Sequence, residues 1–295
     1  MSIKKVALIG FGEVGQILGA ELALLNKFSQ TAFDVAFSDD KSNPAKAAND
    51  SVVRKALSSD DCVRGADLVI SAVTAASTVE AAAAAASALT EGTWYLDLNS
   101  ASPHSKADAA AAINKGGGRY VEASVMSPIE PKRLGAPIFL GGPYARAFEP
   151  IAKAIGFSDA NFYSERPGKT AAAKLCRSVV IKGMEALISE SLLAAHHYGV
   201  EDDVIASLEN LFPHPDWRSY ASYMINRTLQ HGGRRSEEMQ EAARTVSDAG
   251  VTPWMARATV ERQAFAGDLK INATREMLTP LLEDIRVQTK NLARK

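Results

Sequence analysis

The stretch Val6-Ala7-Leu8-Ile9-Gly10-Phe11-Gly12-Glu13-Val14-Gly15 decides the fold. Four apolar residues lead into a G-x-G-x-x-G motif, and the segment Glu13–Asn26 has helical composition. In such a strand–turn–helix the first glycine makes the tight turn, the second admits a pyrophosphate, and the third lets the helix pack against the strand. The N–H groups and the dipole of a helix N-terminus also favour an anion. The motif therefore predicts a dinucleotide site at residues Gly10, Phe11, Gly12, Glu13, Val14 and Gly15.

Short β-rich runs alternate with helical stretches as far as residue 164. The predicted strands are Lys5–Ile9, Phe33–Phe37, Asp67–Val73, Thr93–Leu98, Tyr120–Ser124, Ile138–Leu140 and Ala160–Tyr163. The other helices predicted in this half are Thr78–Leu89, Pro103–Lys115 and Tyr144–Ile155. This alternation predicts an α/β fold, a doubly wound, mostly parallel Rossmann sheet that is covered on both faces.

The sequence becomes helical after Pro167. Ala171–Tyr198 reads as one long helix, with Pro167 and Gly168 before it. The helices predicted after it are Glu201–Leu211, Tyr220–Leu229, Ser236–Ala249, Pro253–Phe265 and Thr279–Leu292. We therefore predict a dinucleotide-binding domain over residues 1–165 and an all-α domain for substrate binding and dimerisation over residues 166–295, joined by the long helix.

Composition narrows the choice of partners. The formal net charge is −1, and acidic and basic residues are interspersed, so we expect neither nucleic acid nor an anionic membrane as the main partner. No run approaches the roughly 20 apolar residues of a membrane span. The two cysteines are far apart and have no metal-type spacing, which favours a reducing cytoplasm. His196, His197 and His214 have no carboxylate at ligand spacing, so we expect no metal.

The strand predicted at Phe33–Phe37 ends at Ser38-Asp39-Asp40. An acid at the end of this strand accepts hydrogen bonds from the ribose hydroxyls of NAD and repels the 2′-phosphate of NADP. Asp39 therefore favours NAD. Because Lys41 is close enough in sequence to tolerate a phosphate, NADP remains the alternative.

Four segments resemble the β-hydroxyacid dehydrogenase and 6-phosphogluconate dehydrogenase superfamily. They are Asp67–Thr74, Leu96–Pro103, Gly135–Gly142 and Gly168–Lys174, the last of which resembles the family's "G-x-G-x-x-x-K". The resemblance implies that Val73, Thr74 and Asn99 border the nicotinamide cofactor, that Lys174 is the catalytic lysine, and that the helical half forms a homodimer. Ser178 occupies the position of the family's asparagine four residues after the lysine, and is predicted to act with Lys174.

The family's substrate loop "D-A-P-V-S-G-G" corresponds here to Glu122-Ala123-Ser124-Val125-Met126-Ser127-Pro128. Met126 and Ser127 are thus predicted to contact substrate, together with Ser100. Pro128 has no N–H to donate, whereas glycines at this end of the loop would let backbone amides approach a carboxylate. We therefore expect a substrate other than a simple 3-hydroxyisobutyrate type.

Oxidation of an alcohol requires a base for the hydroxyl proton. A lysine in water has a pKa of about 10.4 and is protonated at neutral pH. A cationic nicotinamide ring and the exclusion of water both disfavour a second positive charge, so we expect Lys174 to be neutral in the reactive complex and to act as general base. Lys182 lies about 12 Å farther along the helix and is predicted to meet an anionic end of the substrate.

The segment His231-Gly232-Gly233-Arg234-Arg235 places three potential cations beside two glycines. Arginine forks match carboxylates and phosphates, so His231, Arg234 and Arg235 are further candidates for binding an acidic substrate. These residues predict an NAD(P)-dependent oxidoreductase for a small, acidic hydroxy compound. The alternatives are an imine reductase, an oxidoisomerase and a non-catalytic NAD-binding module.

Overall fold

The computed structural model describes residues 3–213, 216–271 and 277–292. The chain divides into two compact units, Met1–Lys174 and Leu175–Lys295. The boundary falls inside the predicted long helix instead of before it. His214, one of the histidines considered for metal binding, lies outside the described residues.

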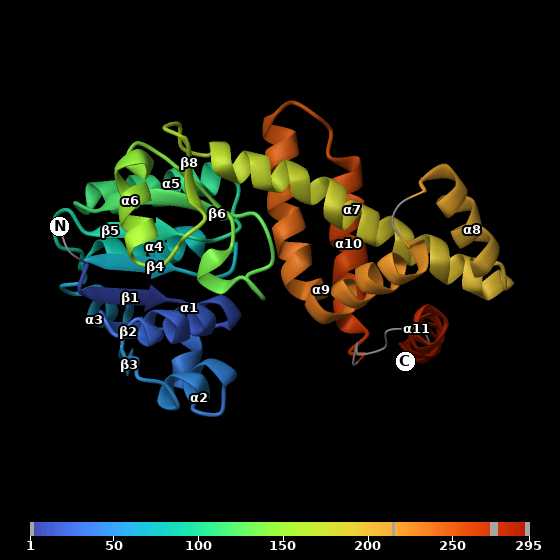
Figure 1. Ribbon diagram of the computed structural model, residues 1–295, viewed down its shortest axis with the longest axis horizontal. Coiled ribbons are helices and arrows are strands. Elements are labelled where there is room, and N and C mark those ends of the chain that lie inside the picture. Colours follow the sequence, from blue (N-terminus) through green and yellow to red (C-terminus); the bar gives the residue numbers. More distant parts are fainter. Residues whose placement is uncertain (1–2, 214–215, 272–276, 293–295) are drawn as a thin grey trace. The chain divides into compact units, whose positions relative to one another are not determined.

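The first unit is built on an eight-stranded sheet (Figure 1). Its strands, in chain order, are β1 (Lys5–Ile9), β2 (Ser29–Phe33), β3 (Arg54–Lys55), β4 (Leu68–Ser71), β5 (Trp94–Asp97), β6 (Arg119–Val125), β7 (Ile138–Gly141) and β8 (Ala160–Ser164). The strand order is β3-β2-β1-β4-β5-β6-β7-β8, and the neighbours are parallel except for the antiparallel pair β6–β7. The chain reverses its direction of winding between β1 and β4, which is where such sheets bind dinucleotides. The predicted Rossmann fold is confirmed.

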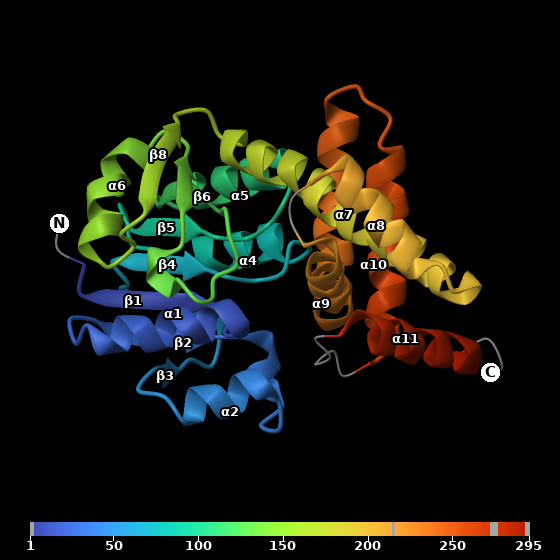
Figure 2. The ribbon, with the colours of Figure 1, turned by 45° about the vertical axis from the view of Figure 1, so that its right-hand side comes forward.

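Helices cover both faces of this sheet (Figures 1 and 2). One face packs against α1 (Glu13–Leu24), α2 (Asn43–Asn49) and α6 (Ala145–Ala154) through a core that contains Leu18, Ile70 and Phe148. The opposite face packs against α3 (Ser59–Val63), α4 (Thr78–Ala86) and α5 (Pro103–Lys115). Small side chains such as Ala82 and Ala109 face the sheet there. The alanine-rich run of α4 therefore serves packing, and alanine is also the residue that most favours a helix.

Strand β2 begins and ends four residues before its predicted position at Phe33–Phe37. Gln30 is buried on this strand because its side-chain Nε2 donates to the backbone oxygen of Gly19 at 3.1 Å. That contact pairs the amide nitrogen of Gln30, while its Oε1 has no hydrogen-bond partner among the described residues. Glutamine is a residue type that is mostly exposed, so its presence did not suggest a buried strand. After Phe33 the chain turns into a 3₁₀ helix, η1 (Val35–Ser38), and Val35 is exposed.

The second unit is helical throughout its described residues, which confirms the all-α domain (Figure 1). Helix α7 (Lys169–Tyr198) begins in the first unit and continues into the second, where α8 (Glu201–Leu211), α9 (Trp217–Asp248), α10 (Trp254–Asp268) and α11 (Leu278–Leu292) follow. A core cluster joins these elements, with Leu192 of α7, Ile225 of α9 and Leu281 of α11 among its fully buried members.

Helix α9 is continuous where the sequence predicted two helices and a glycine loop. Gly232 is buried, and a Cβ atom on it would lie 2.4 Å from the Gln263 backbone oxygen and 2.5 Å from the Gly267 nitrogen. The backbones of α9 and α10 therefore approach each other here too closely for any side chain. The glycine in this segment serves helix packing and does not break the helix.

The two adjacent glycines of α9 give a matched pair of substitutions. Gly232→Ala is expected to lower the free energy of unfolding by about 1–3 kcal/mol, because the added methyl group overpacks the contact with α10. Gly233→Ala is expected to raise it by up to about 1 kcal/mol, because a Cβ there meets no atom within 4 Å and alanine favours a helix. Urea unfolding of the two variants checks this, and equal shifts of the two midpoints would contradict the close approach.

His196 joins three helices of the second unit. Its Nδ1 lies 3.0 Å from a carboxylate oxygen of Glu201 on α8, and its Nε2 lies 3.2 Å from Glu283 on α11. The hydrogen bond to Glu201 raises the pKa of His196 above 6.5; burial opposes this rise and Glu283 adds to it. Hydrogen bonds from Arg286 and then from His196 lower the pKa of Glu283 to about 2. In its protonated form the His196 ring thus bridges two carboxylates.

This bridge predicts a pH-dependent contribution to stability. The raised pKa of His196 makes its contribution complete below pH 6.5 and lost as the pH rises through the folded-state pKa. The pKa values of Glu201 and Glu283 are lowered, so the contribution of these two carboxylates to stability is present above pH 4.5 and is lost as the pH falls. His196→Gln should therefore lower Tm by about 2–4 °C between these limits and by less at about pH 9. His197→Gln, at the exposed neighbouring position, is the control; a deficit in His196→Gln that grows above pH 7 would contradict the assignment.

Candidate cofactor and active site

The glycine loop has the shape that a pyrophosphate requires. Gly10 has a φ of +89°, and a Cβ on it would lie 2.4 Å from the Ala72 backbone oxygen at the end of β4. At the N-terminus of α1, a Cβ on Gly12 would meet no atom within 4 Å, and no side chain caps the helix there. The space beside Gly12 and the N–H groups of the first turn of α1 therefore fit a dinucleotide phosphate.

The acid at the end of β2 is Asp34, not Asp39. One Asp34 carboxylate oxygen accepts from Phe11 N at 2.7 Å in the glycine loop, and the other accepts from Ala36 N at 2.9 Å. Asp34 follows Gly15 by 19 residues, which agrees with the usual spacing of about 20. Asp39 lies beyond η1, where its side chain accepts from Lys41 N. The error in Asp39 follows from the misplaced strand.

The loops after β4 and β5 are joined by one buried side chain. The Asn99 Oδ1 accepts from Val73 N at 2.7 Å, and its Nδ2 donates to Ser71 Oγ at 3.0 Å. Thr74, next to Val73, bonds the hydroxyl of Ser77. Val73 and Thr74 follow β4, the neighbour of β1, and Asn99 follows β5, so all three lie at the carboxyl edge of the sheet that also carries the glycine loop.

Lys174 reaches this same edge from the first turns of α7. Its Nζ donates a hydrogen bond to Ser100 Oγ at 2.8 Å, and both residues are partly buried. This contact brings together the lysine and the serine that the sequence singled out, although 74 positions separate them.

A buried carboxylate fixes the start of α7. Glu122 on β6 is fully buried and accepts from Gly168 N at 2.6 Å and from Ala171 N at 2.7 Å. A hydrogen bond from Ser124 Oγ to Thr170 Oγ1, at 3.2 Å, ties the same strand to the same turn. A negative charge at a helix N-terminus satisfies unpaired N–H groups and complements the helix dipole. Glu122 thus sets the position of α7 from which Lys174 extends.

The predicted substrate loop is partly strand. Residues up to Val125 belong to β6, and Met126 N donates to the Pro137 backbone oxygen at 2.9 Å. The hydroxyl of Ser127 donates to Pro128 O at 2.9 Å. The backbone N–H of Met126 is thus already hydrogen-bonded within the protein. Contacts between the substrate and the side chains of Met126 and Ser127 stay predictions.

Sequence reasoning missed a buried ionic group beneath this edge. Lys106 on α5 is fully buried, and its Nζ donates to Asp97 Oδ1 at 2.7 Å and to Asp97 O at 3.1 Å. Tyr120 OH donates to the other Asp97 oxygen at 2.6 Å. Burial and the Asp97 charge raise the pKa of Tyr120 well above its ordinary value, so it stays a donor. Asp97 Oδ1 also accepts from Asn99 N, and the group thereby supports the Asn99–Ser100 turn. The sequence feature that could have indicated this buried group is Asp97, an acidic residue inside the apolar run Trp94–Leu98.

The remaining predicted residues lie in the second unit. Ser178 is buried on α7, Lys182 forms an ion pair with Glu238, and Arg235 forms one with Glu185. Arg234 and His231 lie on the same helix as Arg235, inside α9 and not in a loop. Cys176, two residues after Lys174 on α7, is exposed.

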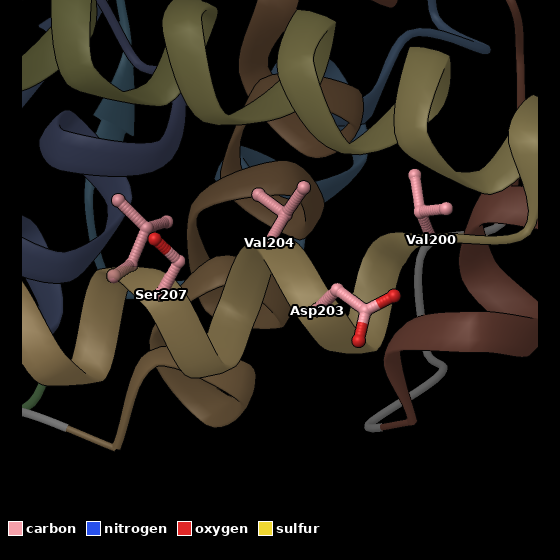
Figure 3. A pocket seen from close by; sticks show the side chains of 5 residues that line it. Val200, Asp203, Val204 and Ser207 are labelled. Atoms are coloured by element: carbon pink, nitrogen blue, oxygen red, sulfur yellow. The ribbon is translucent and has the colours of Figure 1, made fainter.

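A pocket of about 390 Å³ in the second unit lies along α8 (Figure 3). Its lining consists of Val200, Asp203, Val204, Ser207 and Leu208, which include none of the predicted site residues. Among the described residues, no group of three or more histidines, cysteines and carboxylates could hold a metal ion. None of the helices there is long and apolar enough to cross a membrane.

Comparisons with known proteins agree with this geometry. Residues 5–158 match the model of the NAD binding domain of 6-phosphogluconate dehydrogenase, and residues 195–265 match a domain of unknown function, DUF1932. No curated protein sequence matches the chain significantly.

Three solved structures resemble the whole chain. A conserved hypothetical protein from Sinorhizobium meliloti 1021 is 33% identical, with 97% of each chain covered and a TM-score of 0.73. MTH1747, a conserved protein of unknown function described as structurally similar to 3-hydroxyacid dehydrogenases, is 27% identical, with 96% of this chain and 98% of that chain covered and a TM-score of 0.67. The 3-hydroxyisobutyrate dehydrogenase of Mycobacterium tuberculosis, solved with L-serine, is 16% identical, with 97% of this chain and 100% of that chain covered and a TM-score of 0.70.

The 6-phosphogluconate dehydrogenase model covers more than half of the chain, and the glycine loop it includes has the geometry of a dinucleotide site. The chain therefore belongs to the β-hydroxyacid dehydrogenase and 6-phosphogluconate dehydrogenase superfamily, and its first unit is an NAD(P)-binding Rossmann domain.

Proposed function

We propose that the protein is an NAD-dependent dehydrogenase that oxidises a small, acidic hydroxy compound, with Lys174 as the general acid and base. The observation that carries the proposal is the 2.8 Å hydrogen bond from Lys174 Nζ to Ser100 Oγ at the carboxyl edge of the Rossmann sheet. This edge also holds the glycine loop and the Asn99–Val73 contact, so the amine lies on the side of the sheet where the cofactor binds.

The chemistry assigns one task to each group. The nicotinamide, when bound, accepts the hydride from the carbinol carbon. Lys174 in its neutral form takes the hydroxyl proton as the C=O bond forms, and the resulting ammonium returns that proton in the reverse reaction. Ser100 accepts a hydrogen bond from Lys174 and so restricts the direction of the amine. Ser178, four residues farther along α7, stays a predicted partner of Lys174.

The preference for NAD over NADP rests on Asp34. A carboxylate at the end of β2 accepts hydrogen bonds from ribose hydroxyls and repels a 2′-phosphate. Its two oxygens already accept from Phe11 N and Ala36 N, which hold the carboxylate beside the glycine loop. The homodimer and the cytoplasmic location that the sequence favours stay predictions.

The proposal is tested by following reduced-nicotinamide absorbance with a panel of hydroxy acids and sugar acids, with NAD and NADP in separate reactions. We expect turnover with at least one acid and a higher kcat/KM with NAD. Reduction of cyclic imines without oxidation of any acid would indicate an imine reductase instead. Conversion of a substrate without net cofactor reduction would indicate an oxidoisomerase, and cofactor binding without any turnover would favour a binding module.

A further inference from the structure

Strand β6 holds the start of α7 through two side chains of the segment that the sequence matches to a substrate loop. Glu122 accepts from Gly168 N at 2.6 Å and from Ala171 N at 2.7 Å. Two residues farther along the strand, Ser124 Oγ donates to Thr170 Oγ1 at 3.2 Å. All five residues are buried, so bulk water does not compete for these contacts.

The Glu122 carboxylate contacts α7 and no cation. Among the described residues, its hydrogen bonds come only from these two backbone N–H groups, and no lysine, arginine or histidine nitrogen lies within 4.0 Å of it. A buried carboxylate costs free energy unless donors stabilise its charge. Here the donors are the N–H groups at the helix N-terminus, together with the helix dipole. A change at Glu122 therefore acts first on the start of α7.

The turn that β6 holds is the one from which Lys174 extends. Lys174 follows Ala171 by three positions, which is about 4.5 Å along the axis of an α-helix. The same geometry pairs the N–H of residue 174 with the carbonyl of Thr170, four positions earlier. Because these residues belong to one turn, a shift of that turn moves the lysine.

The amine of Lys174 is held by the strand beside β6. Its Nζ donates to Ser100 Oγ at 2.8 Å, and Ser100 follows the last residue of β5, Asp97, by three positions. Strands β5 and β6 are parallel neighbours, with Asp97 opposite Glu122. The backbone of the lysine is thus held from β6 and its amine from the turn after β5, so two adjacent strands determine where the amine lies.

We propose that Glu122 and Ser124 are positioning residues of the reaction, which act through the placement of Lys174 and touch neither substrate nor cofactor. This role rests on the proposed function, in which Lys174 is the general acid and base. A general base works only within hydrogen-bond reach of the proton that it takes, and a displacement of about 1 Å can cost about 10²-fold in rate. At these two positions the matched loop therefore orients the lysine.

The first test is Glu122→Gln, with kcat and KM measured on the acid found in the substrate panel. The amide keeps the length of the side chain but turns an NH₂ group towards one backbone N–H, so one of the two hydrogen bonds is lost. We expect kcat to fall by about 10–100-fold, with KM and NAD affinity close to those of the wild type. Glu91→Gln, at an exposed position before β5, is the control and should leave kcat unchanged.

The hydrogen bond between Ser124 and Thr170 can be removed from either side. Ser124→Ala and Thr170→Val each delete one hydroxyl, and valine keeps the β-branched shape of threonine. We expect similar reductions of kcat in the two variants and no further reduction when they are combined, since all three proteins lack the same bond. Reductions that add, or unchanged kcat in both variants, would remove Ser124 from the proposal. These variants also provide the test if Glu122→Gln does not fold.

The decisive measurement combines Glu122→Gln with Lys174→Ala. A residue that acts by placing the lysine has no effect once the lysine is gone, so the double variant should have the kcat of Lys174→Ala alone. Activity restored by methylamine should be equally insensitive, because a free amine is not attached to α7. A further loss of about 10-fold in the double variant would overturn the proposal and leave the role of Lys174 intact. Wild-type activity in Lys174→Ala would contradict the proposed function itself.

A second readout requires no substrate. A limiting amount of acetic anhydride acetylates accessible amines, and peptide mass analysis compares Lys174 with the exposed Lys115 in the same sample. Glu122→Gln should raise the rate at Lys174 relative to Lys115, because a released first turn exposes the amine. Lys106, which is fully buried, should stay unlabelled as long as the fold is intact. An unchanged ratio of Lys174 to Lys115 would overturn the proposal even if no acid of the panel is oxidised.

Discussion

A Lys174→Ala variant is expected to lose about 10²–10⁴-fold in kcat, with cofactor affinity close to that of the wild type. The range is that of a general base positioned at the reacting hydroxyl. Cofactor affinity should persist because the predicted dinucleotide site is formed by the glycine loop and by Asp34, which accepts from Phe11 N, and the substitution changes neither. The measurement is kcat and KM on the acid found in the substrate panel, with calorimetric titration of NAD.

The matched control for this variant is Lys169→Ala. Lys169 lies on the same helix but is exposed, so its loss removes a lysine from the start of α7 and leaves the Lys174–Ser100 contact in place. Added methylamine should partly restore kcat in Lys174→Ala and have no effect on Lys169→Ala, since a small amine can occupy the space that the lysine vacates. Wild-type activity in Lys174→Ala would show that another group takes the proton, and the role assigned to the lysine would be wrong.

The fold was predictable where local pattern and tertiary structure agree. Strand β1 and helices α5 and α8 have the predicted bounds. An apolar run defines β1, the Ser102 cap and Pro103 define the start of α5, and α8 is a segment without helix breakers that begins with three acidic residues. Strand β2 does not have its predicted bounds. The buried Gln30 on this strand donates a hydrogen bond to Gly19 O, and the pattern of apolar residues gives no sign of that contact. The short elements α2, β3 and α3 were also missed. The two-glycine segment of α9 was misread because sequence alone cannot distinguish a glycine that breaks a helix from one that admits a neighbouring helix.

The candidate site was likewise predictable only where its residues belong to local motifs. The glycine loop and Lys174 follow motifs whose geometry is local, so both could be placed from sequence, and the structure adds the Ser100 contact. The acid at the end of β2 is Asp34 and not the predicted Asp39, because the prediction depended on a strand that lies four residues earlier. Glu122 was included in a substrate loop, whereas it caps α7; the N–H groups that it accepts from lie 46 and 49 positions away. Contacts between residues so far apart in the chain cannot be inferred from the spacing of residues in the sequence.

The buried ion pair of Asp97 and Lys106 predicts the second large effect. Lys106→Met should lower the free energy of unfolding by about 3–5 kcal/mol, since it leaves a fully buried carboxylate without its cation. Tyr120 OH and Asn99 N still donate to Asp97, but neither carries a charge. Urea unfolding measures the loss. Lys115→Met, at the exposed end of the same helix, is the control and should change stability by less than about 0.5 kcal/mol.

A second substitution shows whether the charge itself is responsible. Asp97→Asn in the Lys106→Met background removes the unpaired charge while it keeps an oxygen to accept from Tyr120 or Asn99. The double variant should therefore be more stable than Lys106→Met alone, with a coupling energy of about 1–3 kcal/mol between the two sites. Additive losses would mean that Lys106 stabilises the protein by packing alone. Since Asp97 also holds the turn that carries Asn99, the double variant should retain NAD binding better than Lys106→Met does, which links the buried pair to the cofactor edge of the sheet.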